Sequence, residues 1–568
     1  MTRSMRLALG LGLAALLGSG CGGTPRRFDT TPVVWVDEDD RRPFQPPPEE
    51  TFAPPMWAAM DALIFRPASE LFTFEPARAA VDVNALDEVP DSSWYVNRIS
   101  RRPMDPLEVA RGACDGLGLQ APGPWRVVAG KLEGATPGFV FEDANGVRYV
   151  LKVDRANQPE QATAADAIVA SVFHAAGYHV PCNRVVGFSP EMLVLDEDAT
   201  IEAPDGSEIP MTEAHVTEVT DAASRLPNGR LRAVVSRYID GTPLGPWSYR
   251  GTRDGDPNDV IPHDRRRELR GMYVLAAWVG RWDARRHNTL SAWIERERGG
   301  YVRHYVIDFG ECLGLVEGNF RRARRFGHSQ WLDFGHLAED LFTFGLIHRP
   351  WDDPLDGPAH ETFGSFDIEH FDPEGFRPDY WNGAFERRTE ADSAWMARII
   401  ARLDRPRVRA LADLGRFQDP AVEDALVQIL MGRRERILER YLTRLSPLTA
   451  PEVSRDGDRS RVCLTDLAVR SGIRDAAGRR YRARAWTGDP LRPLEAPAVD
   501  ASGDDGAVCV TLPALAPARP EAGYTVVDVL AETPGRETTG PARMHFVLGG
   551  DGAQLVGLER PADGSAPR

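Results

Sequence analysis

Residues 262–310 read PHDRRRELRGMYVLAAWVGRWDARRHNTLSAWIERERGGYVRHYVIDFG, and this stretch decides the fold. Apolar residues recur at helical spacing in its first third, which predicts a helix packed along one face. A polar loop, 283–288, follows this helix. Two apolar runs, 289–294 and 301–307, are separated by a charged turn with two glycines and predict a pair of strands. Asp308 follows the second strand, so polar groups are expected at the ends of rigid elements.

Three polar side chains in this stretch match the needs of phosphoryl transfer. Asp283 and Asn288 are separated by four residues, and Asp308 begins the tripeptide Asp-Phe-Gly. Phosphoryl transfer uses one carboxylate to orient or deprotonate the attacking hydroxyl, and an amide and a second carboxylate to hold metal ions on the phosphates. The tripeptide alone is weak evidence, because a second copy at 333–335 has no such loop and hairpin before it. The complete order of helix, loop, hairpin and tripeptide is much more specific.

In this order of elements the stretch resembles the protein-kinase-like superfamily, and in particular its atypical HipA-like, CotH-like and phosphatidylinositol-kinase-like branches. The residues before Asp283 are Gly-Arg-Trp, which departs from the usual His-Arg before the aspartate. The resemblance covers roughly residues 125–445. It implies that Asp283 is the catalytic base and that Asn288 and Asp308 hold Mg²⁺ or Mn²⁺. It also implies that ATP or another nucleotide is bound.

The region before this stretch supplies the other half of such a site. Residues 125–153 predict strands around a glycine-bearing turn, and Lys152 lies in the last of them. The resemblance implies that Lys152 pairs with the nucleotide phosphates and that small residues let the backbone approach them. The glycines concerned are Gly130, Gly134 and Gly138. A lysine at the edge of a strand, with its charge in water, is the alternative interpretation of Lys152.

A lysine in this role needs a carboxylate on the helix that follows, and the sequence predicts that helix at 160–176. Asp166 in the body of the helix is the first candidate. Glu160 beside the helix start is the second, although a carboxylate there can simply favour the helix dipole. Plain surface positions for both acids stay open as an alternative.

The first 20 residues predict a targeting segment. An early pair of arginines precedes the apolar run 7–17, and small residues lead into Cys21. This pattern resembles a bacterial lipoprotein signal, which implies a lipid on Cys21 and attachment to the cell envelope, with Gly22 favouring the outer membrane. An ordinary secretory signal with an incidental cysteine is the alternative. No later stretch approaches the ~20 apolar residues that span a bilayer, so the lipid is the expected link to the membrane.

Composition limits the possible partners. The formal net charge is -16 over 568 residues, and an acidic surface argues against non-specific binding of nucleic acid. Residues 447–456 are expected to form a linker. The region from 462 onward changes to short apolar runs between Gly, Pro and Asp turns, which predicts a small β-sandwich with strands at 462–464, 481–485, 508–512, 524–530, 544–548 and 554–558. Cys463 and Cys509 lie in two of these runs, and a disulfide and two buried thiols are equally compatible with the sequence.

Together these patterns predict an α+β chain, with a two-lobed protein-kinase-like fold followed by a small all-β, sandwich-like domain. The expected divisions are a lipoprotein signal peptide at 1–20, a Pro-rich tether at 21–55, an N-terminal extension at 56–120, a kinase-like N-lobe at 121–240, a helical C-lobe at 241–450, a β-sandwich-like domain at 451–560 and a disordered tail at 561–568.

Three functions are compatible with these features. The first is an envelope-attached kinase that transfers phosphate to a hydroxyl of a protein or of a small molecule. The second is a non-catalytic kinase-like lipoprotein that acts as a binding or structural module. The third is a hydrolytic, carbohydrate-active lipoprotein that uses Asp283 and Asp308 as paired acids, which the Asp-Phe-Gly context disfavours.

Overall fold

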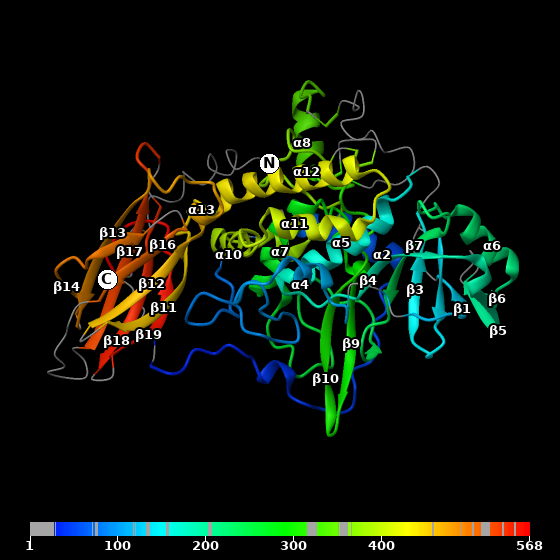
Figure 1. Cartoon of the computed structure of the whole chain (residues 1–568), viewed down its shortest axis with the longest axis horizontal. Coiled ribbons are helices and arrows are strands. Elements are labelled where there is room, and N and C mark those ends of the chain that lie inside the picture. Colours follow the sequence, from blue (N-terminus) through cyan, green and yellow to red (C-terminus); the bar gives the residue numbers. More distant parts are fainter. Residues whose placement is uncertain are drawn as a thin grey trace.

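The computed structural model describes residues 28–567 except 29, 71, 74–77, 117–118, 120, 132–136, 155–157, 203–206, 315–325, 350, 353–361, 365, 457–458, 489, 503–504, 513–522, 537–538 and 550–551. Cys21 with the whole signal segment, and Gly134 in the glycine-bearing turn, therefore lie outside the described residues. The described chain is a mixed α+β structure with several sheets, which confirms the predicted class (Figure 1).

A seven-stranded sheet lies at the right of Figure 1, with the strand order β4-β7-β3-β2-β1-β5-β6. Its strands are β1 (Trp125–Gly130), β2 (Gly138–Glu142), β3 (Arg148–Lys152), β4 (Asn183–Phe188), β5 (Leu193–Glu202), β6 (Glu208–Pro210) and β7 (Leu231–Arg237). One face buries stacked aromatic rings, for example Trp125 on Phe141, with centroids 4.4 Å apart. The helix α6 (Glu213–Ala222) packs against the same cluster through Val216 and Val219. The sequence did not predict this helix, because only two of its residues are buried and its polar positions obscure the pattern.

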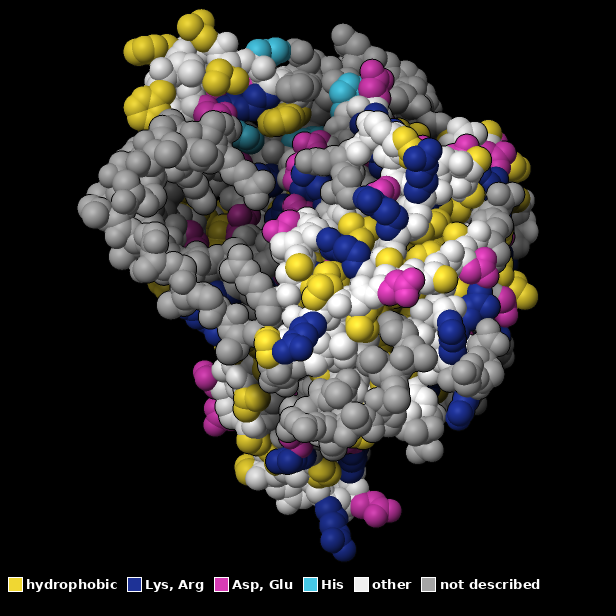
Figure 2. Space-filling model, turned by 90° about the vertical axis from the view of Figure 1, so that its left-hand side faces the viewer, with side chains coloured by type: hydrophobic (Ala, Val, Ile, Leu, Met, Phe, Trp, Pro, Cys, Tyr) yellow, Lys and Arg dark blue, Asp and Glu magenta, His cyan; other side chains and the backbone are white. Residues whose placement is uncertain are grey.

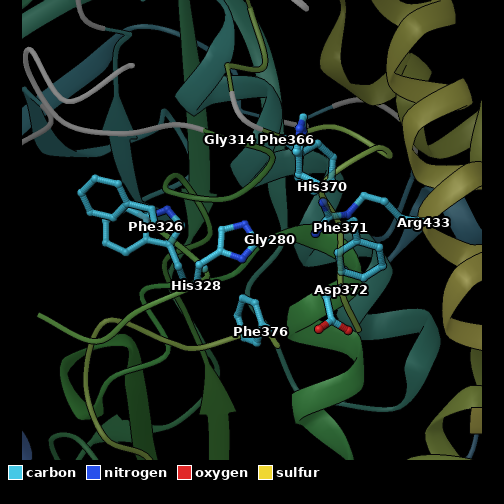
Figure 3. Close-up of a pocket in the computed structure, with 12 residues that line it drawn as sticks. Gly280, Gly314, Phe326, His328, Phe366, His370, Phe371, Asp372, Phe376 and Arg433 are labelled. Carbon is cyan, nitrogen blue, oxygen red and sulfur yellow. The ribbon is translucent and has the colours of Figure 1, made fainter. Parts of the chain in front are cut away.

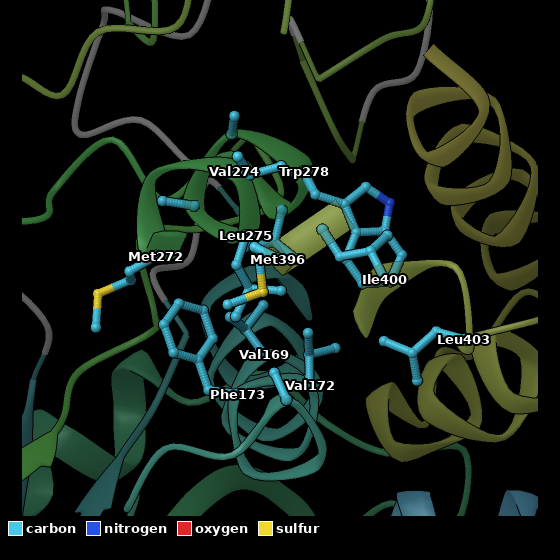
Figure 4. Close-up of a cluster of buried hydrophobic side chains, with 14 of the residues drawn as sticks. Val169, Val172, Phe173, Met272, Val274, Leu275, Trp278, Met396, Ile400 and Leu403 are labelled. Atoms are coloured by element: carbon cyan, nitrogen blue, oxygen red, sulfur yellow. The ribbon is translucent and has the colours of Figure 1, made fainter. Parts of the chain in front are cut away.

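Three helices meet in the centre of the molecule: α5 (Gln161–Ala176), α7 (Arg267–Val279) and α10 (Glu390–Ile400). Their buried side chains form one cluster, which Figure 4 shows with Phe173 and Trp278 among its members. Small residues allow close packing here. A Cβ added at Gly271 would lie 3.0 Å from the Trp395 ring, so glycine at this position lets α7 approach α10. The helices α11 (Arg405–Ala412) and α12 (Pro420–Ile437) complete the helical region that the sequence predicts within residues 241–450.

The N-terminal extension is built into this centre. Trp94 stacks on His304 with ring centroids 3.6 Å apart, and the Tyr95 hydroxyl donates to the carbonyl of Ala176 over 2.9 Å. Asp87 forms ion pairs with arginines of three separate regions, Arg267, Arg398 and Arg560. Burial alone raises the pKa of Asp87, but these arginines outweigh it and hold that pKa well below its usual value.

Two parts expected to be loose are in contact with the body of the protein. In the predicted tether 21–55, Phe44 exchanges backbone hydrogen bonds with Gly300, and the amide of Thr51 donates to the carbonyl of Leu244. In the predicted disordered tail, the carbonyl of Ser565 accepts from Arg543. Proline-rich and polar composition indicated flexibility, but it does not show which backbone groups find partners in other segments.

The C-terminal region contains a four-stranded sheet, β11-β12-β16-β15, and a five-stranded sheet, β14-β13-β17-β18-β19, which lie at the left of Figure 1. Apolar side chains of both sheets share one buried cluster. The strands are β11 (Leu448–Asp456), β12 (Arg459–Asp466), β13 (Arg480–Thr487), β14 (Arg492–Pro493), β15 (Val499–Ser502), β16 (Ala507–Thr511), β17 (Tyr524–Glu532), β18 (Ala542–Gly549) and β19 (Gly552–Glu559). The interpretation of 447–456 as a linker is wrong: this segment is β11, which pairs with β12 because Leu448 is fully buried in the shared core.

Two disulfides form among the described residues. Cys463 and Cys509 are directly opposite each other in β12 and β16 and are bonded, which decides between the two alternatives left open by the sequence. Cys114 and Cys182 form a second bond that the sequence did not indicate, because the two residues lie 68 positions apart. Cys312 is a buried free thiol.

The end of the molecule where the C-terminal sheets lie mixes both signs of charge, and hydrophobic side chains gather at the top of this view (Figure 2). At that height α8 (Phe334–Thr343) projects in Figure 1, and it is followed by the exposed side chains of Phe344 and Leu346. Among the described residues, none of the helices has the length and apolar character needed to cross a bilayer.

Candidate active site

The hairpin of β9 (Thr289–Arg296) and β10 (Gly299–Val306) places the polar loop next to the Asp-Phe-Gly segment. Thr289 is opposite Val306 in the hairpin, and the Ile307 amide donates to the carbonyl of Asn288 over 3.1 Å. The residues just before the first strand and just after the second therefore lie side by side. Antiparallel pairing thus brings Asp283 and Asn288 to Asp308, although they precede it in the sequence by 25 and 20 positions.

Lys152, at the end of β3, extends its side chain to this hairpin end. Its Nζ lies 2.9 Å from Asp308 Oδ1 and 3.4 Å from Asp166 Oδ2. Of the two acids considered as its helical partner, the structure thus places Asp166 beside Lys152. Glu160 lies elsewhere, where its Oε1 is 3.8 Å from Nη1 of Arg232.

Asp166 joins three structural elements through its carboxylate. Besides Lys152, it accepts a hydrogen bond from Asn183 Nδ2 at 2.8 Å and from the amide of Phe309 at 3.1 Å. Asp166 is fully buried on α5, so its geometry is fixed by packing. The carboxylate therefore positions both the lysine of the sheet and the Asp-Phe-Gly segment.

The charges at this point support each other. Burial alone lowers the pKa of Lys152, but the carboxylates of Asp166 and Asp308 outweigh it and raise that pKa above its usual value. Desolvation opposes the ionised form of Asp308 in the same way, and Lys152 and Lys131 reverse the effect and hold its pKa well below its usual value. Asp308 is therefore a carboxylate at neutral pH. Its side chain is still 39% exposed, so it remains accessible to a ligand.

Asp283, at the start of the polar loop, lies in a different environment. It is buried, accepts from Asn288 Nδ2 over 2.7 Å, and its Oδ1 lies 2.8 Å from Nε of Arg285. Burial raises the pKa of Asp283, and the charge of Asp308 adds to this effect, while Arg285 and the Asn288 hydrogen bond oppose it. A carboxylate with a raised pKa that is held by one amide suits a general base.

Arg281 is a site residue that the sequence analysis did not identify. Its guanidinium is buried and donates to three backbone carbonyls, those of Asn288, Ile307 and Asp308, over 2.9 to 3.2 Å. It also lies over the ring of Phe309. Arg281 therefore holds the loop and the Asp-Phe-Gly segment together. In the sequence, Arg281 is visible only as part of the departure from the usual His-Arg before Asp283. No sequence pattern indicates that a side chain donates hydrogen bonds to backbone carbonyls.

Replacing Arg281 should loosen the site and destabilise the protein. Arg281→Met removes a donor from three carbonyls, of which the carbonyl of Asn288 keeps the Ile307 amide, and each buried polar group left without a partner costs about 1–3 kcal/mol. We expect a loss of about 3 kcal/mol in the free energy of unfolding, measured by urea denaturation with tryptophan fluorescence. Arg126→Met, at an arginine on the surface of the seven-stranded sheet, is the control. Equal stability of the Arg281 and control variants would contradict this role.

Lys131 is a second cation near the site that the sequence analysis passed over. Burial and the charge of Lys152 lower its pKa to about 8, although Asp308 and Asp166 act in the opposite direction. It directly follows Gly130 at the end of β1. The sequence feature that could have identified Lys131 as a site residue is its place as a basic residue inside a glycine-bearing turn.

The described glycines of that turn have packing roles. A Cβ added at Gly130 would lie 2.4 Å from the Ile201 side chain, and one at Gly138 would lie 2.1 Å from the carbonyl oxygen of Leu151. Contacts within the sheet therefore already require glycine at both positions, and the expected place of these glycines beside the phosphates stays a prediction. Gly134 lies outside the described residues.

Two other features near the loop have structural explanations. The second Asp-Phe-Gly copy caps α8, because the Asp333 carboxylate accepts from the amide of His336. A cavity lined by Gly280, His328, His370 and Arg433 lies behind the loop (Figure 3). Its volume of about 40 Å³ admits little more than one water molecule, so it is too small for a nucleotide.

The donor atoms at the site fit a hard divalent cation. Asp308 offers an exposed carboxylate and Asn288 an amide, and oxygen donors of these kinds suit Mg²⁺ and Mn²⁺. Within the described residues, no group of three or more His, Cys, Asp and Glu side chains is arranged as a metal site. A cation here would therefore depend on phosphate oxygens for much of its coordination, as is common for Mg²⁺.

Comparison with known proteins gives little further information. No family model and no curated protein matches the chain. Two matching solved structures are a Golgi casein kinase and the Golgi casein kinase with Mn/ADP bound, each 14% identical over 57% of this chain and 75% of that chain. The TM-scores are 0.23 and 0.22. Similarity at this level does not establish a common fold, so the functional argument depends on the geometry of the site itself.

Proposed function

We propose that this protein is an atypical kinase-like phosphotransferase, which binds a nucleotide triphosphate with Mg²⁺ or Mn²⁺ between a β-sheet lobe and a helical lobe. The supporting observation is the meeting of Lys152, Asp166 and Asp308, which come from β3, α5 and the end of β10. Lys152 and Asp308 are 156 positions apart in the sequence, yet their charged groups lie 2.9 Å apart. Phosphoryl transfer requires this combination of a fixed lysine and a metal-binding carboxylate.

Each side chain has a separate task in this proposal. Lys152 binds phosphate oxygens of the nucleotide, and Asp166 keeps its ammonium in place. Asp308 and Asn288 hold the divalent cation, which when bound neutralises charge on the phosphates. Asp283 accepts the proton of the attacking hydroxyl, for which its raised pKa is suited.

The second candidate is a non-catalytic kinase-like module of the envelope. It is favoured by the hydrogen bonds within the site, because Lys152 already pairs with Asp308 and Asn288 already pairs with Asp283. A structural module would need nothing more than these contacts. In this case the C-terminal sheets, which we propose form a β-sandwich, would meet the partner.

Phosphate transfer from radiolabelled ATP separates the two candidates. The wild-type full chain, with Mg²⁺ or Mn²⁺, should release inorganic phosphate slowly or label a hydroxyl acceptor. Lys152→Met should lower this rate by about 100-fold or more, because it removes the cation at the phosphates. Lys152→Arg keeps the charge with a different shape and serves as the comparison. A wild type with no turnover and no nucleotide binding would support the structural module.

We also propose that lipid on Cys21 attaches the protein to the bacterial envelope, with the outer membrane as the expected place. Cys21→Ala removes the only thiol available for this modification in the signal segment. The variant should stay unprocessed or appear in the soluble fraction after salt washing, as followed by immunoblotting of membrane and soluble fractions. A processed variant that remains with the membrane like the wild type would refute the proposal.

A further inference from the structure

A pocket of about 860 Å³ lies directly beside the polar loop. Its walls come from four segments: 52–66, which spans the end of the predicted tether and the start of the N-terminal extension, 248–251, the loop 284–287 and 380–383. The pocket is thus formed where the extension covers the helical region. Its volume suits a ligand of two or three sugar rings or a compound of similar size.

Arg285 connects this pocket with the proposed catalytic base. Its side chain lines the pocket, and its Nε lies 2.8 Å from Asp283 Oδ1. Ala284, the residue after Asp283, lines the pocket as well. A ligand held in the pocket would therefore contact Ala284 and Arg285, which adjoin Asp283 in the loop and in space.

Not all of the arginines that line the pocket are paired with a carboxylate. Arg66 pairs with Asp61 over 3.1 Å, Arg250 with Glu70 over 3.3 Å, and Arg285 with Asp283. In the described part of the chain, Arg286 forms no ion pair with a carboxylate. It makes one long hydrogen bond, from Nη2 to the carbonyl of Pro246 at 3.5 Å, while its Nε is buried without a hydrogen-bond partner. Arg286 is therefore ready to bind an anionic group.

Aromatic side chains form the other notable part of the lining. Trp57 and Phe52 are 64% and 79% exposed, which is unusual for rings of this size. Tyr380 and Trp381 also line the pocket. Exposed rings around a concave site provide flat apolar faces, and an adjacent arginine fixes a carboxylate or phosphate. The CH faces of sugar rings match this combination.

We propose that this pocket binds the phosphate acceptor and that the acceptor is an acidic oligosaccharide, with rings on the aromatic faces and a carboxylate on Arg286. This inference rests on the proposed kinase function. In the reaction, a sugar hydroxyl oxygen bonds to the γ-phosphorus of the nucleotide and the bond from that phosphorus to the β-bridging oxygen breaks. The hydroxyl proton passes to Asp283, and the nucleotide leaves as the diphosphate.

Calorimetric titration of the full chain with two matched sugars tests the proposal. The probes are a trisaccharide of α-1,4-linked galacturonic acid and the corresponding neutral galactose trisaccharide. The acidic trisaccharide should bind at least ten-fold more tightly. Arg286→Gln should weaken it by about ten-fold and remove the preference, while Arg286→Lys should retain part of it. Trp57→Ala should weaken both sugars. Arg482→Gln on β13 is the charge-matched control and should bind like the wild type.

The outcomes separate this inference from the proposed function. Equal binding of both sugars, or binding of a glutamate-rich peptide without binding of either sugar, would overturn the inference. If MgATP binds and neither sugar does, the inference fails and the kinase proposal remains. If the acidic sugar binds with the expected dependence on Arg286 and no nucleotide binds, the pocket stands as a sugar site and the kinase proposal fails.

Discussion

Asp308→Asn is expected to weaken metal-dependent nucleotide binding by about ten-fold or more and to remove most of its dependence on Mg²⁺. The substitution keeps the size of the side chain and removes a charge that Lys152 currently balances over 2.9 Å. Two consequences follow. The divalent cation loses its one exposed carboxylate, and Lys152 keeps only Asp166 as a partner. Titration of ATP at several Mg²⁺ concentrations measures both effects.

The chain offers a matched control for this prediction. Asp333 also begins an Asp-Phe-Gly tripeptide, but its carboxylate caps α8. Asp333→Asn should therefore leave nucleotide binding unchanged, with at most a small loss of helix stability. Identical nucleotide titrations for the Asp308 and Asp333 variants would mean that the first tripeptide has no functional role.

Asp283→Asn is expected to abolish phosphate transfer while sparing nucleotide binding. A general base contributes about 100-fold or more to the rate, so loss of the carboxylate should remove nearly all turnover. Binding should persist because the proposed contacts to the nucleotide come from Lys152, Asn288 and Asp308. Turnover and nucleotide affinity should be measured on the same preparation. Asp404→Asn, at the cap of α11, is a suitable control for acid-to-amide exchange.

The pH dependence of turnover gives an independent check on Asp283. Burial raises the pKa of this carboxylate above its ordinary value of 3.8. A base must be deprotonated to act, so turnover should fall as the pH drops through this raised pKa. Asp308 has a lowered pKa and remains ionised over the same range. Arg285→Gln changes the environment of Asp283 and should therefore shift the pH at which turnover falls. If turnover falls at the same pH in this variant as in the wild type, a group other than Asp283 controls the fall.

The sequence predicted the local elements well where the pattern was strongly periodic. The helix before Asp283, the hairpin after Asn288 and most C-terminal strands lie within a few residues of their expected places. Strict alternation and helical spacing give each of these segments one preferred buried face. β11 was missed because Pro447 and the residues after it have the composition of a linker, and only its pairing with β12 decides its conformation.

The site was predictable in part. Asp283, Asn288 and Asp308 were found because their spacing follows from the chemistry, and Lys152 because a strand lysine after a glycine-bearing turn is informative. Arg281 could not be found in this way, since its partners are backbone carbonyls. The choice between Asp166 and Glu160 as the partner of Lys152 also required the three-dimensional structure. It depends on the position of α5 against β3, which no local pattern records.

The proposed acceptor pocket also could not be predicted from the sequence. Its walls come from four segments that span residues 52 to 383, and the exposed rings of Phe52 and Trp57 lie in a stretch that was predicted to be tether and extension. Composition alone made these residues resemble a flexible arm. Their contact with the loop that bears Asp283 appears only when the chain is folded.

The most direct test of the account is calorimetric titration of ATP into the wild-type full chain, with and without Mg²⁺ or Mn²⁺. We expect saturable binding of one nucleotide per chain that requires the divalent cation and is lost in Lys152→Met. Absence of binding with either cation, or binding that is unaffected by Lys152→Met, would contradict it.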